Sequence, residues 1–323
     1  MNIYFAPLEG VTDVVYRRTH AACFSGVERY YIPFVSPTHH LVFTPKEKRA
    51  VSPAENMGFH AVPQILSKYP DQFLWAAGEL HKLGYQEVNL NLGCPSGTVT
   101  GKGKGSGMLR NLDTLKAFLD EIFAASPVAI SIKTRIGFES EEEWEAIWAL
   151  LSDYPASEVI IHPRTRNQFY KGIPCYQAYE HALSTAKTPL VYNGNLFSPD
   201  DCKQLMTKYP KTNGLMIGRG LLAYPSLAQE LQGGKKLTRE CLRDFHDRLY
   251  DAYLQNEPKN VALIRMRVVM NHLACCFEEP KKALKAIRKA QNEYAYLQAV
   301  ERLFGEYEMC KTPCYQGPEE LNY

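Results

Sequence analysis

Residues 87–96 read Glu-Val-Asn-Leu-Asn-Leu-Gly-Cys-Pro-Ser. Residues 88–92 are apolar or carry amides, and this run predicts a β-strand over 87–92 that the following glycine and proline end. Gly93 permits an unusual turn and Pro95 makes it rigid, so that Cys94 is held on a loop at the carboxyl end of the strand. A lone cysteine is more often a buried structural residue than a reactive one, and both interpretations stay open at this point.

Seven further short runs of β-branched, aromatic and other apolar residues predict strands. They cover residues 3–6, 29–35, 60–65, 128–134, 158–162, 189–193 and 215–218. Most are continuous rather than alternating, which is typical of parallel strands that are buried on both faces. Helical patterns lie between most of them, at 71–83, 112–125, 141–151 and 199–208. The connection at 44–58 contains two prolines and predicts a loop with a short helix.

Eight predicted strands that alternate with helices indicate an α/β protein of the (β/α)8 TIM barrel type. The structural alternative is a doubly wound open sheet. No strict Gly-x-Gly-x-x-Gly follows the first strand, which argues against that alternative. Polar residues instead follow the carboxyl ends of many different strands, where a barrel has its active site.

The alternation ends at Gly233-Gly234, and no convincing strand follows up to Tyr323. Helical patterns there cover 239–255, 261–277, 280–291 and 293–304. We therefore expect two domains, a barrel over residues 1–232 and a C-terminal all-α helical bundle over residues 235–323.

The composition predicts a soluble globular protein rather than a disordered one. Of the 323 residues, 45% are hydrophobic and 22% are charged, and the formal net charge is only +2, so that any binding of a polyanion must depend on how the charge is distributed. No signal peptide and no membrane-spanning run is expected. The nine cysteines are scattered and form no Cys-x-x-Cys pair. We expect a cytoplasmic monomer with reduced thiols and no metal site.

Two basic residues stand at alternate positions near the end of the fifth predicted strand. Lys133 and Arg135 therefore face the same way. A lysine that faces the inside of a barrel is costly unless it meets an anion, and a reduced flavin is such an anion. The alternative is a solvent-exposed lysine just beyond the strand.

Other strand ends carry groups suited to a flat, hydrogen-bonding cofactor with a phosphate tail. Glycines follow strands seven and eight, where a barrel phosphate site requires close backbone approach and a short helix near Leu221 adds its dipole. FMN fits this description. The residues are Pro7, Leu8 and Glu9 after strand one, Gln64 on strand three, His162 on strand six, Asn193, Gly194 and Asn195 after strand seven, and Gly218 and Arg219 after strand eight.

Taken together, these motifs resemble the tRNA-dihydrouridine synthase family over residues 3 to about 228. The shared motifs occur in the family's order and spacing: Ala-Pro-Leu-Glu-Gly-Val-Thr-Asp at 6–13, Asn-Leu-Asn-Leu-Gly-Cys-Pro-Ser at 89–96, Ile-Lys-Thr-Arg-Ile-Gly at 132–137, His-Pro-Arg-Thr-Arg at 162–166, Asn-Gly-Asn at 193–195 and Met-Ile-Gly-Arg-Gly at 216–220. The resemblance implies an NADPH- and FMN-dependent enzyme that reduces the carbon 5–carbon 6 double bond of a uridine in tRNA to 5,6-dihydrouridine.

The resemblance also implies residue roles. Cys94 matches the catalytic general acid, Asn91 matches the amide that binds the uracil, and Arg135 matches a basic residue near the base or the flavin. The expected flavin contacts are Pro7, Leu8, Glu9, Gln64, Lys133, His162, Asn193, Gly194, Asn195, Gly218 and Arg219. This chain departs from the family pattern at three positions, with Ser67 and Pro163 in place of glycines and Asn195 in place of an acidic residue.

Several basic residues are candidate tRNA contacts. Five recur at helical spacing without an acid between them and predict a basic stripe for phosphates: Lys281, Lys282, Lys285, Arg288 and Lys289. The alternative is a solvated helix face. Lys102 and Lys104 lie in a glycine-rich loop at 101–107, which either closes over a flipped base or is simply mobile. Arg164 and Arg166 complete the candidates.

Two other functions remain open at this point. One is an FMN-dependent barrel reductase of a free pyrimidine, similar to a dihydroorotate dehydrogenase, which would not need a basic-striped helical tail. The other is a catalytically silent tRNA-binding protein. The presence of Cys94 and Lys133 argues against a silent protein.

Overall fold

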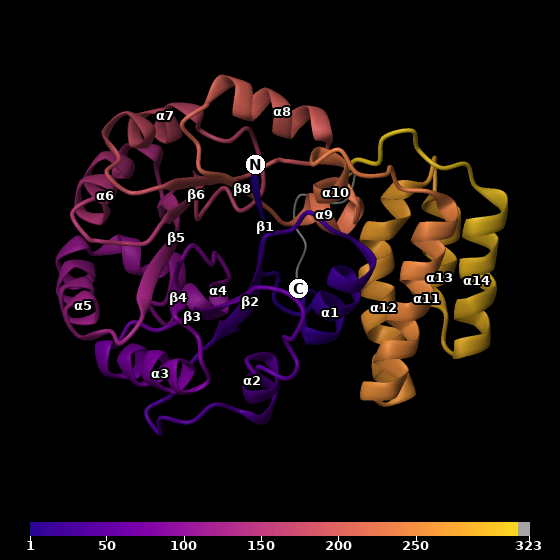
Figure 1. Cartoon of the computed structure of the whole chain (residues 1–323), viewed down its shortest axis with the longest axis horizontal. Coiled ribbons are helices and arrows are strands. Elements are labelled where there is room, and N and C mark those ends of the chain that lie inside the picture. Colours follow the sequence, from indigo (N-terminus) through magenta and orange to yellow (C-terminus); the bar gives the residue numbers. More distant parts are fainter. Residues whose placement is uncertain (316–323) are drawn as a thin grey trace.

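A computed structural model describes residues 1–315, and its central feature is a closed barrel of parallel strands in the order β1 to β8 (Figure 1). The strands are β1 Asn2–Phe5, β2 Arg29–Val35, β3 Ala61–Ile65, β4 Glu87–Leu92, β5 Ala129–Gly137, β6 Val159–Thr165, β7 Leu190–Asn193 and β8 Gly214–Ile217. The barrel closes where β1 pairs with β8, from Asn2 opposite Gly214 to Phe5 opposite Ile217. The predicted (β/α)8 fold and all eight strands are confirmed.

Two strands are longer than the sequence predicts. β5 continues to Gly137 and β6 to Thr165, and the two remain paired up to these residues. Arg135 and Arg164 therefore lie on strands and not beyond them. Their side chains follow the alternation of the strand, which directs them toward the barrel interior or its rim.

Most of the helices between residues 14 and 231 surround the barrel and cover the outer faces of its strands, whereas α4 Gly97–Thr100 lies inside this ring and lines the cavity at the barrel mouth (Figure 1). The other helices are α1 Val14–Cys23, α2 Pro45–Ala50, α3 Pro70–Lys82, α5 Leu112–Ala125, α6 Trp144–Leu151, α7 Tyr176–Thr185, α8 Pro199–Lys208, α9 Arg219–Ala223 and α10 Leu227–Leu231, with short 3-10 helices at Gly105–Arg110 and Glu141–Glu143. The local sequence explains where helix α8 begins. Ser198 caps α8 in a reciprocal pair with Asp201, and Pro199 occupies the first turn.

Four helices after the barrel lie side by side at one flank of the molecule (Figure 1). They are α11 Arg239–Asn256, α12 Lys259–Leu273, α13 Lys281–Lys289 and α14 Glu293–Glu306, with a 3-10 turn at Ala274–Cys276. The Phe245 ring on α11 lies 5.8 Å from Tyr16 and 5.2 Å from Phe24, which places α11 against α1. Apart from one bridge between Phe277 and Met309, residues 235–315 contain no β-structure, as predicted.

The predicted boundary between residues 232 and 235 falls in the turn after α10. Apolar packing is continuous from the barrel into the four C-terminal helices. Whether the helical region is an independent domain therefore stays a prediction, and its residues 316–323 lie outside the described residues.

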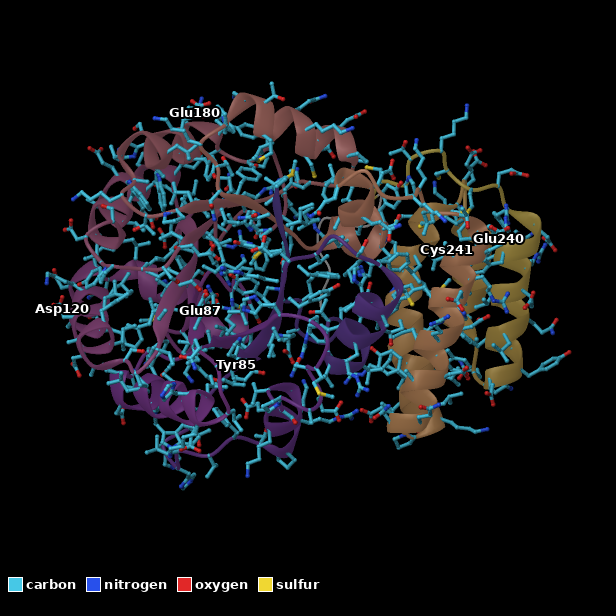
Figure 2. The ribbon with its side chains drawn as sticks, in the orientation of Figure 1. Tyr85, Glu87, Asp120, Glu180, Glu240 and Cys241 are labelled. Carbon is cyan, nitrogen blue, oxygen red and sulfur yellow. The ribbon has the colours of Figure 1, made fainter. Side chains whose placement is uncertain are left out.

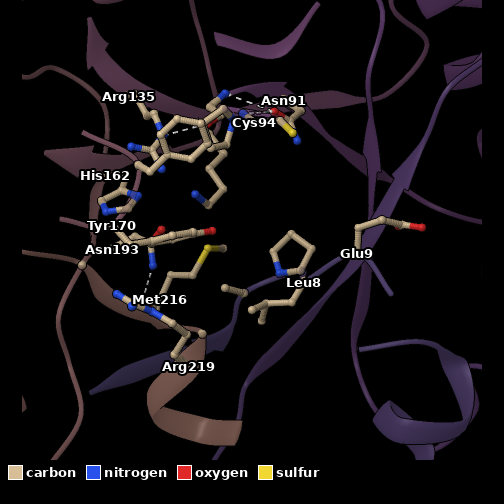
Figure 3. Close-up of a pocket in the computed structure, with 18 of the residues that line it drawn as sticks. Leu8, Glu9, Asn91, Cys94, Arg135, His162, Tyr170, Asn193, Met216 and Arg219 are labelled. Carbon is tan, nitrogen blue, oxygen red and sulfur yellow. Dashed lines mark hydrogen bonds between the residues drawn. The ribbon is translucent and has the colours of Figure 1, made fainter. Parts of the chain in front are cut away.

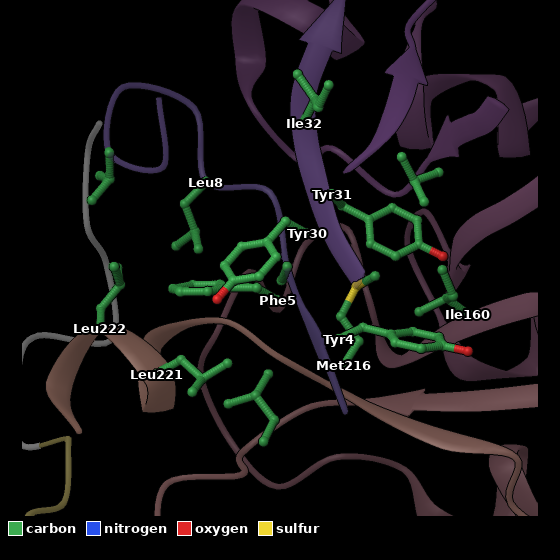
Figure 4. Packing of buried hydrophobic residues seen from close by; sticks show 14 of the residues in the cluster. Tyr4, Phe5, Leu8, Tyr30, Tyr31, Ile32, Ile160, Met216, Leu221 and Leu222 are labelled. Atoms are coloured by element: carbon green, nitrogen blue, oxygen red, sulfur yellow. The ribbon is translucent and has the colours of Figure 1, made fainter. Parts of the chain in front are cut away.

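The two ends of the barrel differ. Tyr4, Tyr31 and Met216 pack inside the barrel, whereas Phe5 and Tyr30 pack on its outer face against α1 (Figure 4). At the amino ends of the strands the buried carboxylate of Glu158 accepts hydrogen bonds from the Tyr4 and Tyr31 hydroxyls at 3.1 and 2.6 Å, and Arg29 lies 3.4 Å from it. Partnered polar groups thus close this end, and the carboxyl ends remain for a binding site.

The molecular surface is polar where it meets solvent. Asp120 on α5 and Glu180 on α7 lie at the periphery of the helical ring (Figure 2). Within residues 1–315, no helix combines the length and the apolar character that crossing a membrane requires.

Candidate active site

A cavity of about 640 Å³ opens at the carboxyl ends of the barrel strands, a volume within the usual range for small-molecule and cofactor sites. Residues from the ends of all eight strands line it (Figure 3). Every residue predicted to act in catalysis, cofactor binding or base binding is part of this lining: Pro7, Leu8, Glu9, Gln64, Asn91, Cys94, Lys133, Arg135, His162, Asn193, Gly194, Asn195, Gly218 and Arg219.

The Asn91 side chain holds the loop that carries Cys94. Its Oδ1 accepts hydrogen bonds from the backbone N–H groups of Gly93 at 3.1 Å and Cys94 at 2.9 Å. Its Nδ2 donates to Gln64 Oε1 at 2.6 Å. The amide oxygen is fully used, and one N–H of Asn91 remains for a ligand.

Two buried residues that the sequence did not single out extend this arrangement into the barrel. Gln64 Nε2 donates to Asn89 Oδ1 at 2.7 Å, and Asn89 Nδ2 donates to Ser131 Oγ at 2.9 Å. A chain of amides therefore runs from β5 through β4 and β3 to the Cys94 loop. The alternation of Asn89 and Asn91 in an otherwise apolar strand was the available signal for this chain.

The glycine-rich loop packs against Cys94 through its second half. Gly105 has φ +57, and a Cβ there would lie 3.0 Å from the Cys94 carbonyl oxygen. Ser106 Oγ donates to the same oxygen at 2.8 Å. Residues 105–109 are buried in a 3-10 helix, so this half of the loop supports Cys94 and only its tip around Lys102 is exposed.

Burial and nearby charge act in opposite directions on the Cys94 thiol. Burial raises its pKa above the ordinary value, and the hydrogen bond from the Ser96 backbone, Arg135 and Lys133 offset only part of that effect. Cys94 therefore keeps its proton at neutral pH. A protonated thiol at the wall of a cavity can act as a general acid.

Positive charge dominates the cavity. Burial and the neighbouring Arg135 lower the pKa of Lys133 to about 7, and no hydrogen bond or ion pair to its ammonium occurs within residues 1–315. Glu9 is the one acidic residue of the described lining, but its carboxylate pairs with Lys46 at 2.7 Å and points away from the cavity (Figure 3). An anionic or acceptor-rich ligand would restore the charge on Lys133.

Backbone carbonyls hold the Arg135 guanidinium in place. Its Nε donates to Gly93 O at 2.9 Å and its Nη1 donates to Thr165 O at 2.8 Å. The guanidinium also lies 5.6 Å from the Tyr170 ring. Arg135 thereby ties the Cys94 loop to the end of β6 while it lines the cavity.

The hydrogen bond of His162 defines its tautomer. Arg164 Nη1 lies 3.2 Å from His162 Nε2, and a guanidinium can only donate, so Nε2 is the acceptor and Nδ1 carries the proton. Burial, together with Arg135, Lys133 and Arg164, lowers the pKa of His162 well below its ordinary value. His162 is therefore a neutral donor.

Arg164 is placed differently from the sequence prediction, which made it a tRNA contact. Its side chain is fully buried, and its guanidinium donates to the backbone oxygens of Lys171 and Gly172 as well as to His162. This position follows from β-strand alternation, which gives Arg164 the same facing as His162. Arg164 therefore orients His162 and has no access to a polyanion at the surface.

Backbone geometry shapes the cavity wall at β7 and β8. Asn193 Nδ2 donates to Met216 O at 2.7 Å across the two strands. Asn195 has φ +26, a left-handed conformation that asparagine tolerates. A Cβ on Gly220 would lie 2.0 Å from the Leu196 carbonyl oxygen, so only glycine permits the close approach of the two strand ends.

The other candidate tRNA contacts fall into two groups. The five basic residues of α13 are all exposed on one face of the helix, and none forms an ion pair within the described part of the chain: Lys281, Lys282, Lys285, Arg288 and Lys289. Near the cavity, Lys102 is exposed, Lys104 donates to Ser36 Oγ at 3.0 Å, and half-buried Arg166 donates to Pro95 O at 3.1 Å.

Aromatic and apolar residues of the cavity were missed by the sequence reasoning. They come from β2, from the loops after β6 and β7 and from β8: Phe34, Phe169, Tyr170, Phe197 and Met216. They supply apolar surface for a planar ring system between the polar groups of the strand ends. The cavity thus fits a flat, hydrogen-bonding and partly anionic group such as FMN. Residues 1–315 hold no cluster of three or more histidine, cysteine or acidic side chains suited to a metal.

Comparison with known proteins agrees with this geometry. A family model described as dihydrouridine synthase matches residues 4–313. The chain belongs to the dihydrouridine synthase family. The similarity to this family therefore extends beyond the motifs, over the barrel and the C-terminal helices.

Individual relatives are similar over long segments. The probable tRNA-dihydrouridine synthase 1 of Synechocystis sp. is 33% identical over 236 residues, which cover 70% of this chain and 63% of that relative. The tRNA-dihydrouridine synthase B of Shewanella oneidensis is 28% identical over 280 residues, which cover 83% of this chain and 85% of that relative. Among solved structures, morphinone reductase matches with a TM-score of 0.54 at 12% identity and covers 74% of this chain and 87% of its own. At that identity the likeness concerns the barrel fold alone.

We predict that Asn91→Ala loosens the Cys94 loop. The substitution removes the acceptor for two backbone N–H groups, and an unsatisfied buried group costs roughly 1–3 kcal/mol. Hydrogen exchange at the amides of Gly93 and Cys94 should accelerate, and alkylation of Cys94 by iodoacetamide should become faster than in the unchanged protein. Thr98→Ala is the control, because the hydroxyl of this exposed α4 residue bonds Ser96 Oγ and no other side chain within residues 1–315. Equal exchange and alkylation in Asn91→Ala and Thr98→Ala would contradict the supporting role of Asn91.

Proposed function

We propose that this protein is a tRNA-dihydrouridine synthase that reduces the carbon 5–carbon 6 double bond of a uridine in tRNA, with FMN as cofactor and NADPH as electron donor. The observation that carries the proposal is the placement of a protonated Cys94 thiol in the same cavity as the Lys133 and Arg135 side chains. Family membership and the names of the relatives support the substrate class.

FMN, when bound, supplies the hydride that such a reduction requires. The chain's own residues bind and orient it. Lys133 and the Nδ1–H of His162 offer donors to the polar edge of the ring. Gly218 and Arg219 at the end of β8 are the candidates for the phosphate. Pro7 and Leu8, together with Met216, provide apolar contact.

Cys94 holds the proton that carbon 5 of the uracil must receive. Its raised pKa keeps that proton on Sγ until charge develops on the ring beside it. The amide chain through Asn91 fixes the position of the thiol. The remaining N–H of Asn91 can donate to a carbonyl of the base, which is the role that the family resemblance implies.

A uridine within folded tRNA must leave its stack to reach a cavity at a barrel mouth, and this costs a few kcal/mol. Phosphate contacts at the surface stabilise the complex against that cost. We propose α13 as one such surface, with Lys102, Lys104 and Arg166 near the cavity as another.

The thiols of all nine cysteines are free, which supports the predicted cytoplasmic location.

Two alternatives are less well supported. A reductase of a free pyrimidine would share the cavity but not the exposed, unpaired basic face of α13. A catalytically silent binding protein would have no need of a fixed thiol and an unpartnered lysine in one cavity. Family membership favours the tRNA enzyme over both.

We predict that Cys94→Ser still binds FMN and is still reduced by NADPH but forms dihydrouridine roughly 10²–10⁴-fold more slowly, because a weaker general acid replaces the thiol. Single-turnover product analysis with tRNA, beside stopped-flow flavin reduction without tRNA, separates the two half-reactions. Product formation close to the wild-type rate would exclude Cys94 as the proton donor.

We predict that the affinity of flavin-free protein for FMN falls as the pH rises above about 7. In the empty cavity Lys133 loses its proton near this pH, and an acceptor-rich ligand raises the pKa of Lys133, so binding takes up a proton. The dissociation constant should rise by up to tenfold per pH unit until the pKa of the bound state is reached.

Fluorescence titration of FMN from about pH 6 to about pH 9 measures this dependence. Lys133→Met should bind more weakly at low pH and show a flatter profile. Lys116→Met, which alters an exposed lysine on α5 outside the cavity, is the control and should follow the wild type. Parallel profiles for wild type and Lys133→Met would show that Lys133 does not meet the ligand.

We predict that replacement of the five basic residues of α13 by Gln weakens tRNA binding and flattens its salt dependence. Each neutralised phosphate contributes roughly 0.7–0.9 to the slope of log affinity against log salt. The helix face is wider than a single RNA backbone, so not all five side chains can contact phosphates at the same time. We therefore expect the slope of log affinity against log salt to fall by about two to three rather than by five. NADPH oxidation without tRNA should be unchanged.

The matched control replaces Lys82, Lys116 and Lys208 on the barrel helices by Gln, and circular dichroism verifies that both variants fold. An unchanged affinity and slope in the folded α13 variant would make the face a solvated surface. The tRNA path would then lie nearer Lys102, Lys104 and Arg166.

A further inference from the structure

Three aromatic rings surround the guanidinium of Arg219. The Arg219 Cζ lies 4.5 Å from the ring centre of Tyr170, 5.0 Å from Tyr315 and 5.3 Å from Phe197. All three distances are within the range of cation–π attraction. We name Tyr170, Phe197 and Tyr315 the aromatic cage.

The three rings of the cage come from distant parts of the chain. Tyr170 follows β6 and Phe197 follows β7, so both belong to loops at the barrel mouth. Tyr315 comes from the segment after α14, beyond the last helix of the C-terminal region. The helical region therefore contributes a ring to the surroundings of Arg219, and Arg219 itself lines the cavity together with Tyr170 (Figure 3).

Backbone pairing brings the segment after α14 back to the barrel. Glu278 N–H donates to Glu308 O at 2.9 Å and Cys310 N–H donates to Cys276 O at 2.8 Å, on either side of the bridge between Phe277 and Met309. The turn at Ala274–Cys276 is itself attached to α9, because Cys276 Sγ lies 3.0 Å from Ala223 O. The segment is thus fixed against the short helix that begins at Arg219.

Packing fixes the Tyr315 ring itself. The ring stacks between His272 at 5.7 Å and Phe197 at 5.6 Å, with interplanar angles of 26° and 29°. Only 8% of Tyr315 and 9% of Arg219 are exposed. The Arg219 Nη2 lies 3.5 Å from Asn195 Oδ1, and the guanidinium also donates a hydrogen bond to the Tyr315 hydroxyl. The other N–H groups of the guanidinium are oriented by the cage and remain available to an anion.

We propose that Tyr315 is a positioning residue that holds Arg219 for the terminal phosphate of the cofactor, so that the segment after α14 contributes to phosphate selectivity in the barrel. The proposal rests on the proposed function, because it takes Arg219 as the residue that meets the phosphate of FMN. Tyr315 itself acts through Arg219 and has no contact with the reacting atoms.

The test compares two ligands that differ only in the phosphate. Full-length protein freed of flavin is titrated with FMN and with riboflavin, and flavin fluorescence gives both dissociation constants. Tyr315→Leu keeps apolar bulk against Phe197 and Ala223 but removes the ring face. We expect it to lose about tenfold in FMN affinity, in line with a desolvated cation–π contact, and less than about twofold in riboflavin affinity.

Two further variants make the interpretation specific. Tyr315→Phe keeps the ring and should retain FMN affinity within about threefold, which shows that the ring face, more than the hydroxyl, orients Arg219. Tyr294→Leu alters an exposed tyrosine on α14 and should match the wild type for both ligands. Thermal unfolding of the flavin-free variants verifies that Tyr315→Leu is folded at the titration temperature.

The possible outcomes separate the cage from the proposed function. An FMN-to-riboflavin affinity ratio in Tyr315→Leu equal to that of the wild type would overturn the positioning role. Such an unchanged ratio includes the case in which both affinities fall equally, which would show a general effect on the cavity. A wild type that binds FMN no better than riboflavin would instead remove the phosphate site at Arg219, on which the proposed function depends.

Discussion

The fixed position of the Cys94 loop depends on one buried hydrogen-bonded chain. Ser131, Asn89, Gln64 and Asn91 connect three adjacent strands of the barrel and end on the backbone N–H groups of Gly93 and Cys94. A buried amide is costly unless its groups are bonded, so each member of the chain restricts the conformation of the next. The barrel therefore positions the thiol through side chains that never need to touch a substrate.

Three basic side chains of the cavity are accommodated in different ways. Arg135 donates to two backbone carbonyl oxygens and faces the Tyr170 ring, Arg219 is held by aromatic faces, and Lys133 has no partner within residues 1–315. These arrangements keep positive charge in a buried space at a cost to folding stability. That cost is recovered when an acceptor-rich ligand binds, which is why the unpartnered lysine indicates a cofactor site rather than a structural interior.

Much of this architecture was available from the sequence because it depends on local patterns. The eight apolar runs and the two-residue spacing of Lys133 and Arg135 are properties of single strands, and all the predicted cavity residues lie in the cavity. The same alternation should have placed Arg164 inside with His162, so its assignment to the surface ignored an available signal. Asn89 was detectable in the same way, as an amide within an apolar strand.

Tyr315 belongs to a different class of residue, which single-sequence reasoning does not reach. Its position depends on a bridge between residues 277 and 309 and on stacking against rings from α12 and from the loop after β7. No local pattern encodes these contacts, because each of them joins segments that are far apart in the sequence.

The position of Tyr315 also bears on whether the barrel and the C-terminal helices are separate functional units. If the segment after α14 completes the aromatic cage around Arg219, the C-terminal region and the barrel are linked by a shared binding site as well as by apolar packing. Removal of the C-terminal region would then weaken cofactor binding together with tRNA binding, and the two regions would not behave as separable catalytic and RNA-binding units.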